Sequence, residues 1–167
     1  MKKILVVDDD RIISSFMHDL LTKQGHEVTS ASDGLSALDV LESYTPDIIF
    51  VDLVMPNIGG DKLCKVIRAM DRLREVRLVI LSAVAAEQDA NIEKLAVDAC
   101  IAKGPLPKMA GHILSVLEQL ETSRSSRLSR EVIGTQGMAS RRIAEELLSV
   151  KRHFEMILER MSEGILE

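Results

Sequence analysis

The chain has 167 residues, enough for one domain of about 100 to 150 residues and an appendage. Aromatic residues make up only 2% of it, so aliphatic side chains must fill the core, and a stacking platform for single-stranded nucleic acid is not expected. Residues 1–121 carry 13 Lys and Arg against 19 Asp and Glu, and this net charge of −6 argues against a protein that binds nucleic-acid phosphates in general. Residues 122–167 carry 8 Lys and Arg against 7 Asp and Glu, a net charge of +1.

Short apolar runs alternate with helical spacing along residues 1–121. The predicted strands are 4–7, 27–31, 48–51, 77–81 and 99–102. The predicted helices are 11–24, a second opening at Asp33-Gly34, a third beginning at Gly60, and then 87–95 and 107–121. This alternation predicts an α/β fold, a doubly wound, five-stranded parallel sheet with five helices on its two faces.

Charged and polar residues stand where the predicted strands end. Asp8 and Asp9 follow the first strand, Asp52 the third, Ser82 the fourth and Lys103 the fifth. The carboxyl ends of parallel strands share one sheet edge, so these residues are expected to converge there. Asp10 is read separately, as a helix-start residue, and capping is the alternative reading for the whole Asp8-Asp9-Asp10 run.

Three crowded carboxylates repel one another unless a cation enters, and a hard divalent ion with oxygen ligands, such as Mg²⁺, suits them best. No His or Cys is placed as a nucleophile or general base. A carboxylate beside Mg²⁺, a Lys and a hydroxyl can attack a phosphoryl group, which predicts an acyl phosphate on Asp52.

The chain resembles the receiver domain of two-component response regulators over about residues 1–121. The resemblance rests on Asp8-Asp9, on Asp52 followed by Met55-Pro56 and Gly60, on Ser82-Ala83 and on Lys103, in this order and spacing. It implies the flavodoxin-like fold and phosphoryl transfer to the chain from a histidine kinase or phosphotransfer protein.

The resemblance also implies a role for each site residue. Asp52 is the phosphoacceptor, and Asp9, Asp52 and the backbone carbonyl of Val54 bind Mg²⁺ directly. Asp8 acts mainly through a metal-bound water. Ser82 donates a hydrogen bond to the phosphoryl group, and Lys103 pairs with it.

Two positions depart from the family pattern. The family has Pro directly after the Lys, usually joined by a cis bond, whereas this chain has Lys103-Gly104-Pro105. The family has Tyr or Phe three residues before the Lys, where this chain has Cys100. The usual aromatic switch is therefore absent. In the family, the positions two residues after the phosphoacceptor Asp and after the Ser border the path of the hydrolytic water. In this chain they are Val54 and Val84, which are apolar and cannot orient that water, so the resemblance predicts slow self-dephosphorylation.

The two cysteines, Cys64 and Cys100, show no metal-ligand spacing and are read as reduced core thiols of a cytoplasmic protein. The N-terminus lacks the long apolar core of a signal peptide. No run of about 18 apolar residues is present, so the sequence predicts no membrane crossing.

The tail divides into two predicted parts. Residues 122–139 form a basic, Ser/Arg-rich linker, for which a solvated segment is favoured over a nucleic-acid patch. Residues 140–167 carry an a/d heptad stripe that predicts an amphipathic or coiled-coil helix and a homodimer; the alternative is a helix packed on its own receiver. The end of this segment, 153–167, is similar to the entry of a PAS domain, so the chain is expected to be a fragment that relays its state to an output domain.

Three other functions stay open from the sequence. Cys100 and Gly104 motivate a docking module that works without phosphorylation. Residues 140–148 faintly resemble the first helix of a helix-turn-helix, which would make the parent protein a DNA-binding transcriptional regulator. Asp8 and Asp10 have the two-residue spacing of a phosphatase or hydrolase of similar fold, although Met55-Pro56 and Lys103 favour the receiver.

Overall fold

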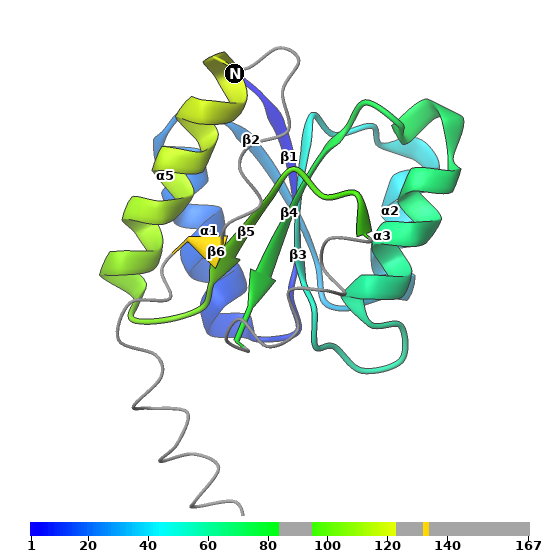
Figure 1. Cartoon of the computed structure of the whole chain (residues 1–167), viewed down its shortest axis with the longest axis horizontal. Helices are drawn as coiled ribbons and strands as arrows, with labels where there is room; N and C mark the ends of the chain where they lie inside the picture. Colours follow the sequence, from blue (N-terminus) through cyan, green and yellow to red (C-terminus); the bar gives the residue numbers. More distant parts are fainter. Residues whose placement is uncertain (84–94, 123–131, 134–167) are drawn as a thin grey trace, which may run out of the picture. The chain divides into compact units, whose positions relative to one another are not determined.

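The structure, a computed structural model, describes residues 1–83, 95–122 and 132–133 (Figure 1). The chain divides into two units, Met1–Gly134 and Thr135–Glu167. The second unit lies outside the described residues, together with most of the helix predicted at 87–95. The predicted helix, dimer and PAS-like entry within 140–167 lie outside them as well.

The first unit is a parallel sheet in the order β2-β1-β3-β4-β5-β6. Its strands are β1 (Lys3–Val7), β2 (Glu27–Ala31), β3 (Ile48–Asp52), β4 (Arg77–Ser82), β5 (Ala99–Ala102) and β6 (Val132–Ile133). Its described helices are α1 (Arg11–Lys23), α2 (Gly34–Ser43), α3 (Gly60–Ala69) and α5 (Leu106–Thr122), with a 3₁₀ turn at Asp71–Leu73. The first five strands confirm the predicted doubly wound sheet.

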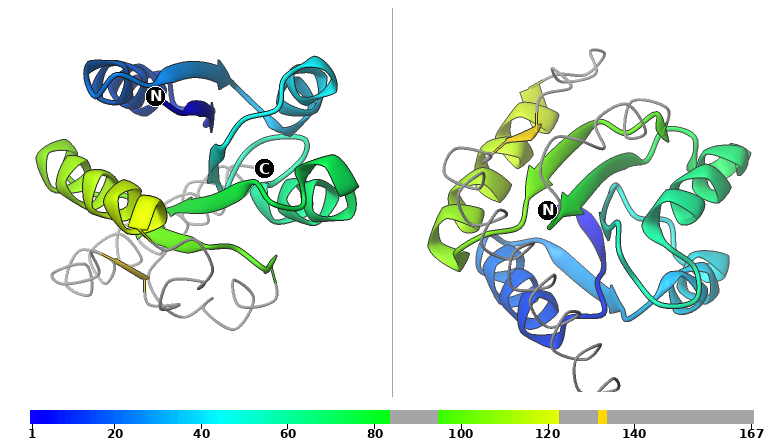
Figure 2. Two further views of the ribbon diagram at one scale, coloured as in Figure 1. Left: turned by 90° about the horizontal axis from the view of Figure 1, so that it is seen from above. Right: turned by 60° about the horizontal axis from the view of Figure 1, so that its bottom comes forward.

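The two faces of the sheet are covered by different helices (Figure 2). On one face the side chains of α1 and α5 pack against alternate strand residues, among them Ile4, Val6 and Phe50. On the other face α2 and α3 pack against Leu5, Val7 and their neighbours. Because both faces are covered, the central strands are apolar throughout, which is why runs of Val, Ile and Leu identified them in the sequence.

Local signals explain how α1 and α2 begin and how α1 ends. The Asp10 carboxylate accepts hydrogen bonds from the backbone N–H groups of Ile12 and Ile13, at 2.8 and 3.3 Å, and so caps α1. Asp33 caps α2 through the backbone N–H of Ser36, and the Ser36 hydroxyl accepts a bond from the Asp33 N–H in return. Gly25, with φ of +82°, turns the chain after α1.

Strand β6 lies within the stretch 122–139 that the sequence predicts to be a linker. Residues 132–133 were expected within the solvated segment 122–139, but they pair in parallel with β5, Val132 beside Cys100 and Ile133 beside Ile101. Two apolar residues followed by Gly134 are too short a run to predict a strand on their own. Their pairing depends on the edge that β5 offers, which the sequence pattern does not reveal.

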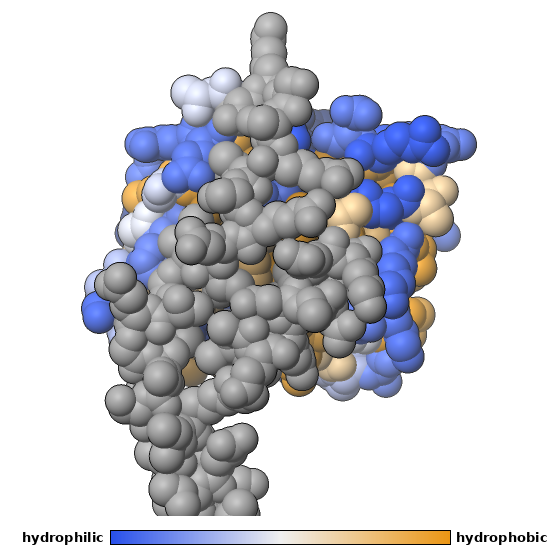
Figure 3. All heavy atoms as spheres, in the orientation of Figure 1, coloured by the Kyte–Doolittle hydropathy of each residue, from blue (hydrophilic) through white to orange (hydrophobic). Residues whose placement is uncertain are grey.

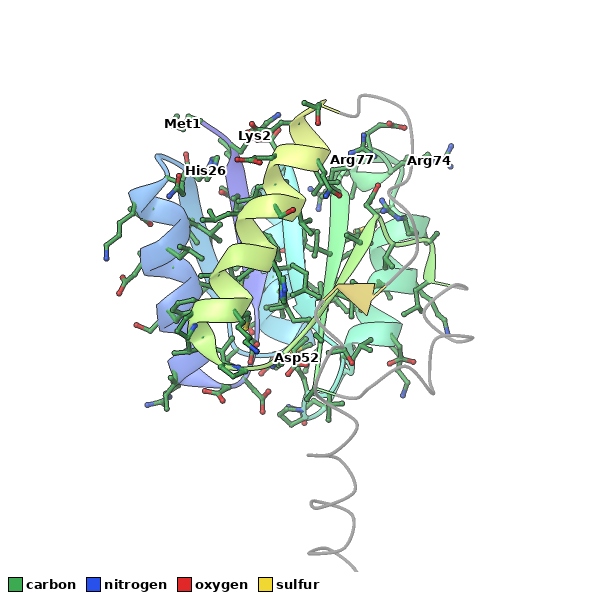
Figure 4. All side chains as sticks on the ribbon, turned by 60° about the vertical axis from the view of Figure 1, so that its left-hand side comes forward. Met1, Lys2, His26, Asp52, Arg74 and Arg77 are labelled. Atoms are coloured by element: carbon green, nitrogen blue, oxygen red, sulfur yellow. The ribbon has the colours of Figure 1, made fainter. Side chains whose placement is uncertain are left out.

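At the end of the sheet opposite Asp52, a buried ion cluster joins α3, β4 and the residue before β5 (Figure 4). Asp98 is 6% exposed and accepts hydrogen bonds from Arg68 Nη2 at 2.9 Å, Arg77 Nη1 at 2.8 Å and the Leu78 N–H at 2.8 Å. Arg68 also donates through Nε to the Ala96 carbonyl at 2.9 Å. The Asp98 charge is therefore well satisfied.

Hydrophilic side chains dominate the described surface around α3 and α5, and apolar ones show only in small areas (Figure 3). Within the described residues, no helix combines the length and the apolar character needed to cross a membrane.

We predict that Asp98→Ala lowers the free energy of unfolding by about 3–5 kcal/mol, because it removes the buried carboxylate that accepts hydrogen bonds from Arg68, Arg77 and the Leu78 N–H. Urea denaturation measures this loss. The matched control is Asp71→Ala, which removes the ion pair between Asp71 and Arg74. These side chains are 92% and 68% exposed, so this variant should lose about 0.5 kcal/mol of unfolding free energy or less. Equal losses in the two variants would contradict a structural role for Asp98.

A second prediction concerns alkaline stability. Burial raises the pKa of the Cys64 thiol to about 12, whereas the unfolded chain releases this proton near pH 9. The folded protein therefore keeps the Cys64 thiol protonated at pH values where the unfolded chain loses this proton. The contribution of the buried thiol to stability is fully present below about pH 9 and is lost as the pH rises toward 12. Relative to Cys64→Ala, the wild-type unfolding free energy should fall by about 2 kcal/mol between roughly pH 8 and 10.5. Parallel pH profiles in the two proteins would refute this.

Candidate functional site

The residues predicted to converge stand at one edge of the sheet. Val7 pairs with Val51, so the next residues, Asp8 and Asp52, are neighbours at the ends of β1 and β3. Ser82 closes β4 and lies beside Ala102, the last residue of β5. Lys103 follows at once, and its backbone N–H donates to the Ser82 carbonyl at 2.7 Å. Residues far apart in sequence thus meet because parallel strands end together.

Lys103 links the two buried carboxylates. Its Nζ lies 2.8 Å from Asp8 Oδ2 and 2.7 Å from Asp52 Oδ2. Asp8 and Asp52 are only 2% and 4% exposed, and the Lys103 side chain is 11% exposed. Charges this deeply buried need a partner. One ammonium group serves both carboxylates.

Burial and pairing shift two pKa values in this site. Burial raises the pKa of Asp8 above its usual value, although its contacts with Lys103 and with the Asp10 N–H oppose the shift. For Lys103, burial by itself lowers the pKa, but the contacts with Asp52 and Asp8 outweigh it and the net pKa is raised. Lys103 therefore keeps its proton, and the site retains a fixed positive charge beside Asp52.

Asp9 completes a group that fits a metal ion. One carboxylate oxygen each from Asp8, Asp9 and Asp52 lies within 4.8 Å of the others. Asp8 and Asp52 are buried and Asp9 is exposed, so the group is open on one side. Hard oxygen ligands of this kind match Mg²⁺. Asp10 is outside the group because its carboxylate caps α1. A phosphatase or hydrolase of similar fold would need Asp10 as a second acid beside Asp8, so this position does not favour that alternative.

The loop after β3 is shaped around Asp52. The Val54 N–H donates to Asp52 Oδ1 at 3.3 Å, a backbone contact that the sequence prediction missed because no side-chain pattern reports it. The Gly60 N–H donates to the Leu53 carbonyl at 3.1 Å. A Cβ on Gly60 would collide with the Asp52 carbonyl oxygen, which explains why Gly closes this loop.

The two departures from the family pattern are accommodated in different ways. The Pro105 carbonyl accepts the N–H of Met109 at 3.0 Å, so α5 begins one residue earlier than predicted, at Leu106. Pro107 then lies in the first turn, where a missing N–H costs nothing. Cys100 is 4% exposed and packs into the core on the side of α2 and α3. Val84 lies outside the described residues.

Comparison with known proteins agrees with this geometry. The chain is 43% identical over 67 residues to CqsS, the CAI-1 autoinducer sensor kinase/phosphatase of Vibrio cholerae, a stretch covering 40% of this chain and 10% of CqsS. It is 34% identical over 94 residues to PhoP, the alkaline phosphatase synthesis transcriptional regulatory protein of Bacillus subtilis, covering 56% of this chain and 37% of PhoP. The matched stretch thus spans less than half of either curated relative.

Among solved structures, the chain is similar to the response regulator TrrA of Thermotoga maritima in complex with Mg²⁺-BeF. The TM-score is 0.61 at 25% identity, covering 73% of this chain and 98% of TrrA, and it confirms the predicted flavodoxin-like fold. Residues 4–104 match the family of response regulator receiver domains. Because that match takes in more than half of the 167 residues, the chain belongs to the response regulator receiver domain family.

Proposed function

We propose that Asp52 accepts a phosphoryl group from the phosphohistidine of a histidine kinase or phosphotransfer protein, in a Mg²⁺-dependent reaction. The observation that carries this proposal is the contact of Lys103 Nζ with both Asp52 and Asp8, beside the open acidic group that includes Asp9. The chain then acts in phosphorelay signalling as a phosphoacceptor and not as a classical enzyme.

In the proposed transfer, a carboxylate oxygen of Asp52 attacks the phosphorus. A P–O bond forms while the P–N bond to the donor histidine breaks, and the bonding electrons return to the imidazole nitrogen. Lys103 keeps its proton and offsets the negative charge of the phosphoryl oxygens, and the Ser82 hydroxyl donates a hydrogen bond to one of them. The product is an aspartyl phosphate.

The donor set supports Mg²⁺ as the cofactor. Asp9, Asp52 and the carbonyl of Val54 would bind it directly, and Asp8 through a water. When bound, the ion supplies positive charge to the oxygens of the transferring group. TrrA, a structural relative, is in complex with Mg²⁺-BeF, which supports this assignment by similarity.

Exposed apolar side chains around the site support a protein as the donor. Among the described residues, the large hydrophobic side chains that are more than half exposed are Met1, Ile12, Leu35 and Val54. Ile12 lies in the first turn of α1, Leu35 is the second residue of α2, and Val54 comes two residues after Asp52. All three belong to segments that leave the carboxyl edge of the sheet, where a donor must approach.

The tail and the location belong to the same proposal. The heptad stripe of 140–167 supports relay through a helix, and a homodimer, to an output domain. The buried thiols Cys64 and Cys100 form no disulfide, which supports a reducing compartment such as the cytoplasm.

We expect incubation with acetyl phosphate and Mg²⁺ to add one phosphoryl group to the protein, measured by intact mass. Asp52→Asn should abolish the addition, because the amide is not a nucleophile. This experiment also separates the phosphoacceptor from a docking module that works without phosphorylation. An unmodified wild-type mass in saturating Mg²⁺ would favour the docking module.

Neighbouring acids provide the matched control. Asp9→Asn should raise the Mg²⁺ concentration needed for half-maximal modification by about tenfold or more, because a ligand charge is lost. Asp10→Asn should leave the Mg²⁺ requirement unchanged, since Asn caps a helix as well as Asp does. A similar shift in both variants would show that the effect is not one of coordination.

We also predict slow loss of the phosphoryl group. The Val54 side chain is 64% exposed beside Asp52 and offers no group to orient an attacking water. Val54→Asn adds an amide there and should speed hydrolysis by about tenfold, a change that corresponds to about 1.4 kcal/mol in the barrier. The decay of the phosphorylated mass with time, in Mg²⁺ buffer, measures both rates. Wild-type decay within seconds would rule this prediction out.

A further inference from the structure

The sheet edge formed by β5 is paired with a segment from beyond α5. In the strand order β2-β1-β3-β4-β5-β6, β5 would be the last strand if β6 were absent. The pairs are Cys100 with Val132 and Ile101 with Ile133. A two-residue strand contributes few hydrogen bonds, so a modest coupling free energy is enough to shift the paired form toward the unpaired one.

The strand that holds this segment also carries the site lysine. β5 has four residues, Ala99–Ala102, and Lys103 follows directly. At that point the chain is tied to β4 through the Ser82 carbonyl, at 2.7 Å, and to Asp52 and Asp8 through Nζ. The ladder with β6 therefore lies two to three residues from the group that contacts the phosphoacceptor. Because β5 has only four residues, a displacement of Lys103 also moves the residues of β5 that pair with β6.

We propose that the pairing of Val132–Ile133 with β5 is coupled to the state of Asp52, and that a phosphoryl group on Asp52 weakens this pairing. The proposal rests on the proposed function of Asp52. In the arrangement where β6 is paired, Lys103 contacts Asp8 and Asp52 together. A phosphoryl group offers Lys103 new oxygens farther from the Asp52 carboxylate, so this double contact ends and the end of β5 shifts.

The consequence is a signal route through the sheet edge. In sequence, residues 132–133 lie between α5 and residues 135–167, so release of the strand lengthens the stretch after α5 that is not paired with the sheet. Coupling of this kind is reciprocal: if the adduct weakens the pairing, loss of the pairing strengthens the adduct by the same factor.

Hydrogen exchange on the full chain tests the proposal, with Mg²⁺ and beryllofluoride as the phosphoryl mimic. Whichever amide of Val132 and Ile133 donates to β5 should exchange about 5-fold faster, or more, once the adduct forms. Amides of β2, at the far side of the sheet, serve as the internal reference. Asp52→Asn should show no change on addition of the mimic.

The reciprocal measurement uses the double variant Val132→Pro/Ile133→Pro, which removes both N–H groups from the strand. Its affinity for beryllofluoride in Mg²⁺ should be about 5-fold tighter than that of wild type. Ser126→Pro, a substitution in the tail six positions before Val132, is the control and should leave the affinity unchanged.

The outcomes separate the two proposals. If no adduct forms on the wild type, the proposed function fails and this inference fails with it. If the adduct forms while exchange at residues 132–133 is unchanged or slower, only this inference is overturned. An unchanged affinity in the double proline variant overturns the coupling as well.

Discussion

The site depends on one electrostatic constraint: Asp8 and Asp52 are buried side by side at the ends of neighbouring strands and need a cation between them. The sheet order places β4 between β3 and β5, so the side chain that follows β5 must reach Asp52 across two strand spacings, about 10 Å. Lys fits this task because its charge sits at the end of a long, flexible stem. Ser82 ends the strand that lies in between, which is why a hydroxyl stands on the same edge.

Two buried ion clusters lie at opposite ends of the sheet, and their charge balance distinguishes them (Figure 4). At one end, two guanidinium groups and a backbone N–H surround the single carboxylate of Asp98. At the other, one ammonium group meets Asp8 and Asp52, with Asp9 close by. The first cluster is satisfied and holds β4 and β5 in place. The second retains excess negative charge and therefore favours a further cation.

The sequence predicted the five main strands and the site because both follow from local pattern. A strand buried on both faces is an apolar run, and a charged residue at its end marks the edge. The Asp98 cluster was missed because Arg68 and Arg77 look like ordinary surface residues until the fold brings α3 and β4 to the residue before β5. Strand β6 was missed because pairing with a neighbouring edge, and not its own two apolar residues, makes Val132–Ile133 a strand.

Cys100 stands at the position where the family pattern has an aromatic side chain. The thiol is small, buried on the side of α2 and α3, and cannot alternate between buried and exposed positions as an aromatic ring does. The backbone of the same residue is paired with Val132. A strand ladder uses N–H and C=O groups, so it works with any side chain at position 100. The coupling that we propose therefore does not need an aromatic residue at this position, because it acts through the backbone of β5.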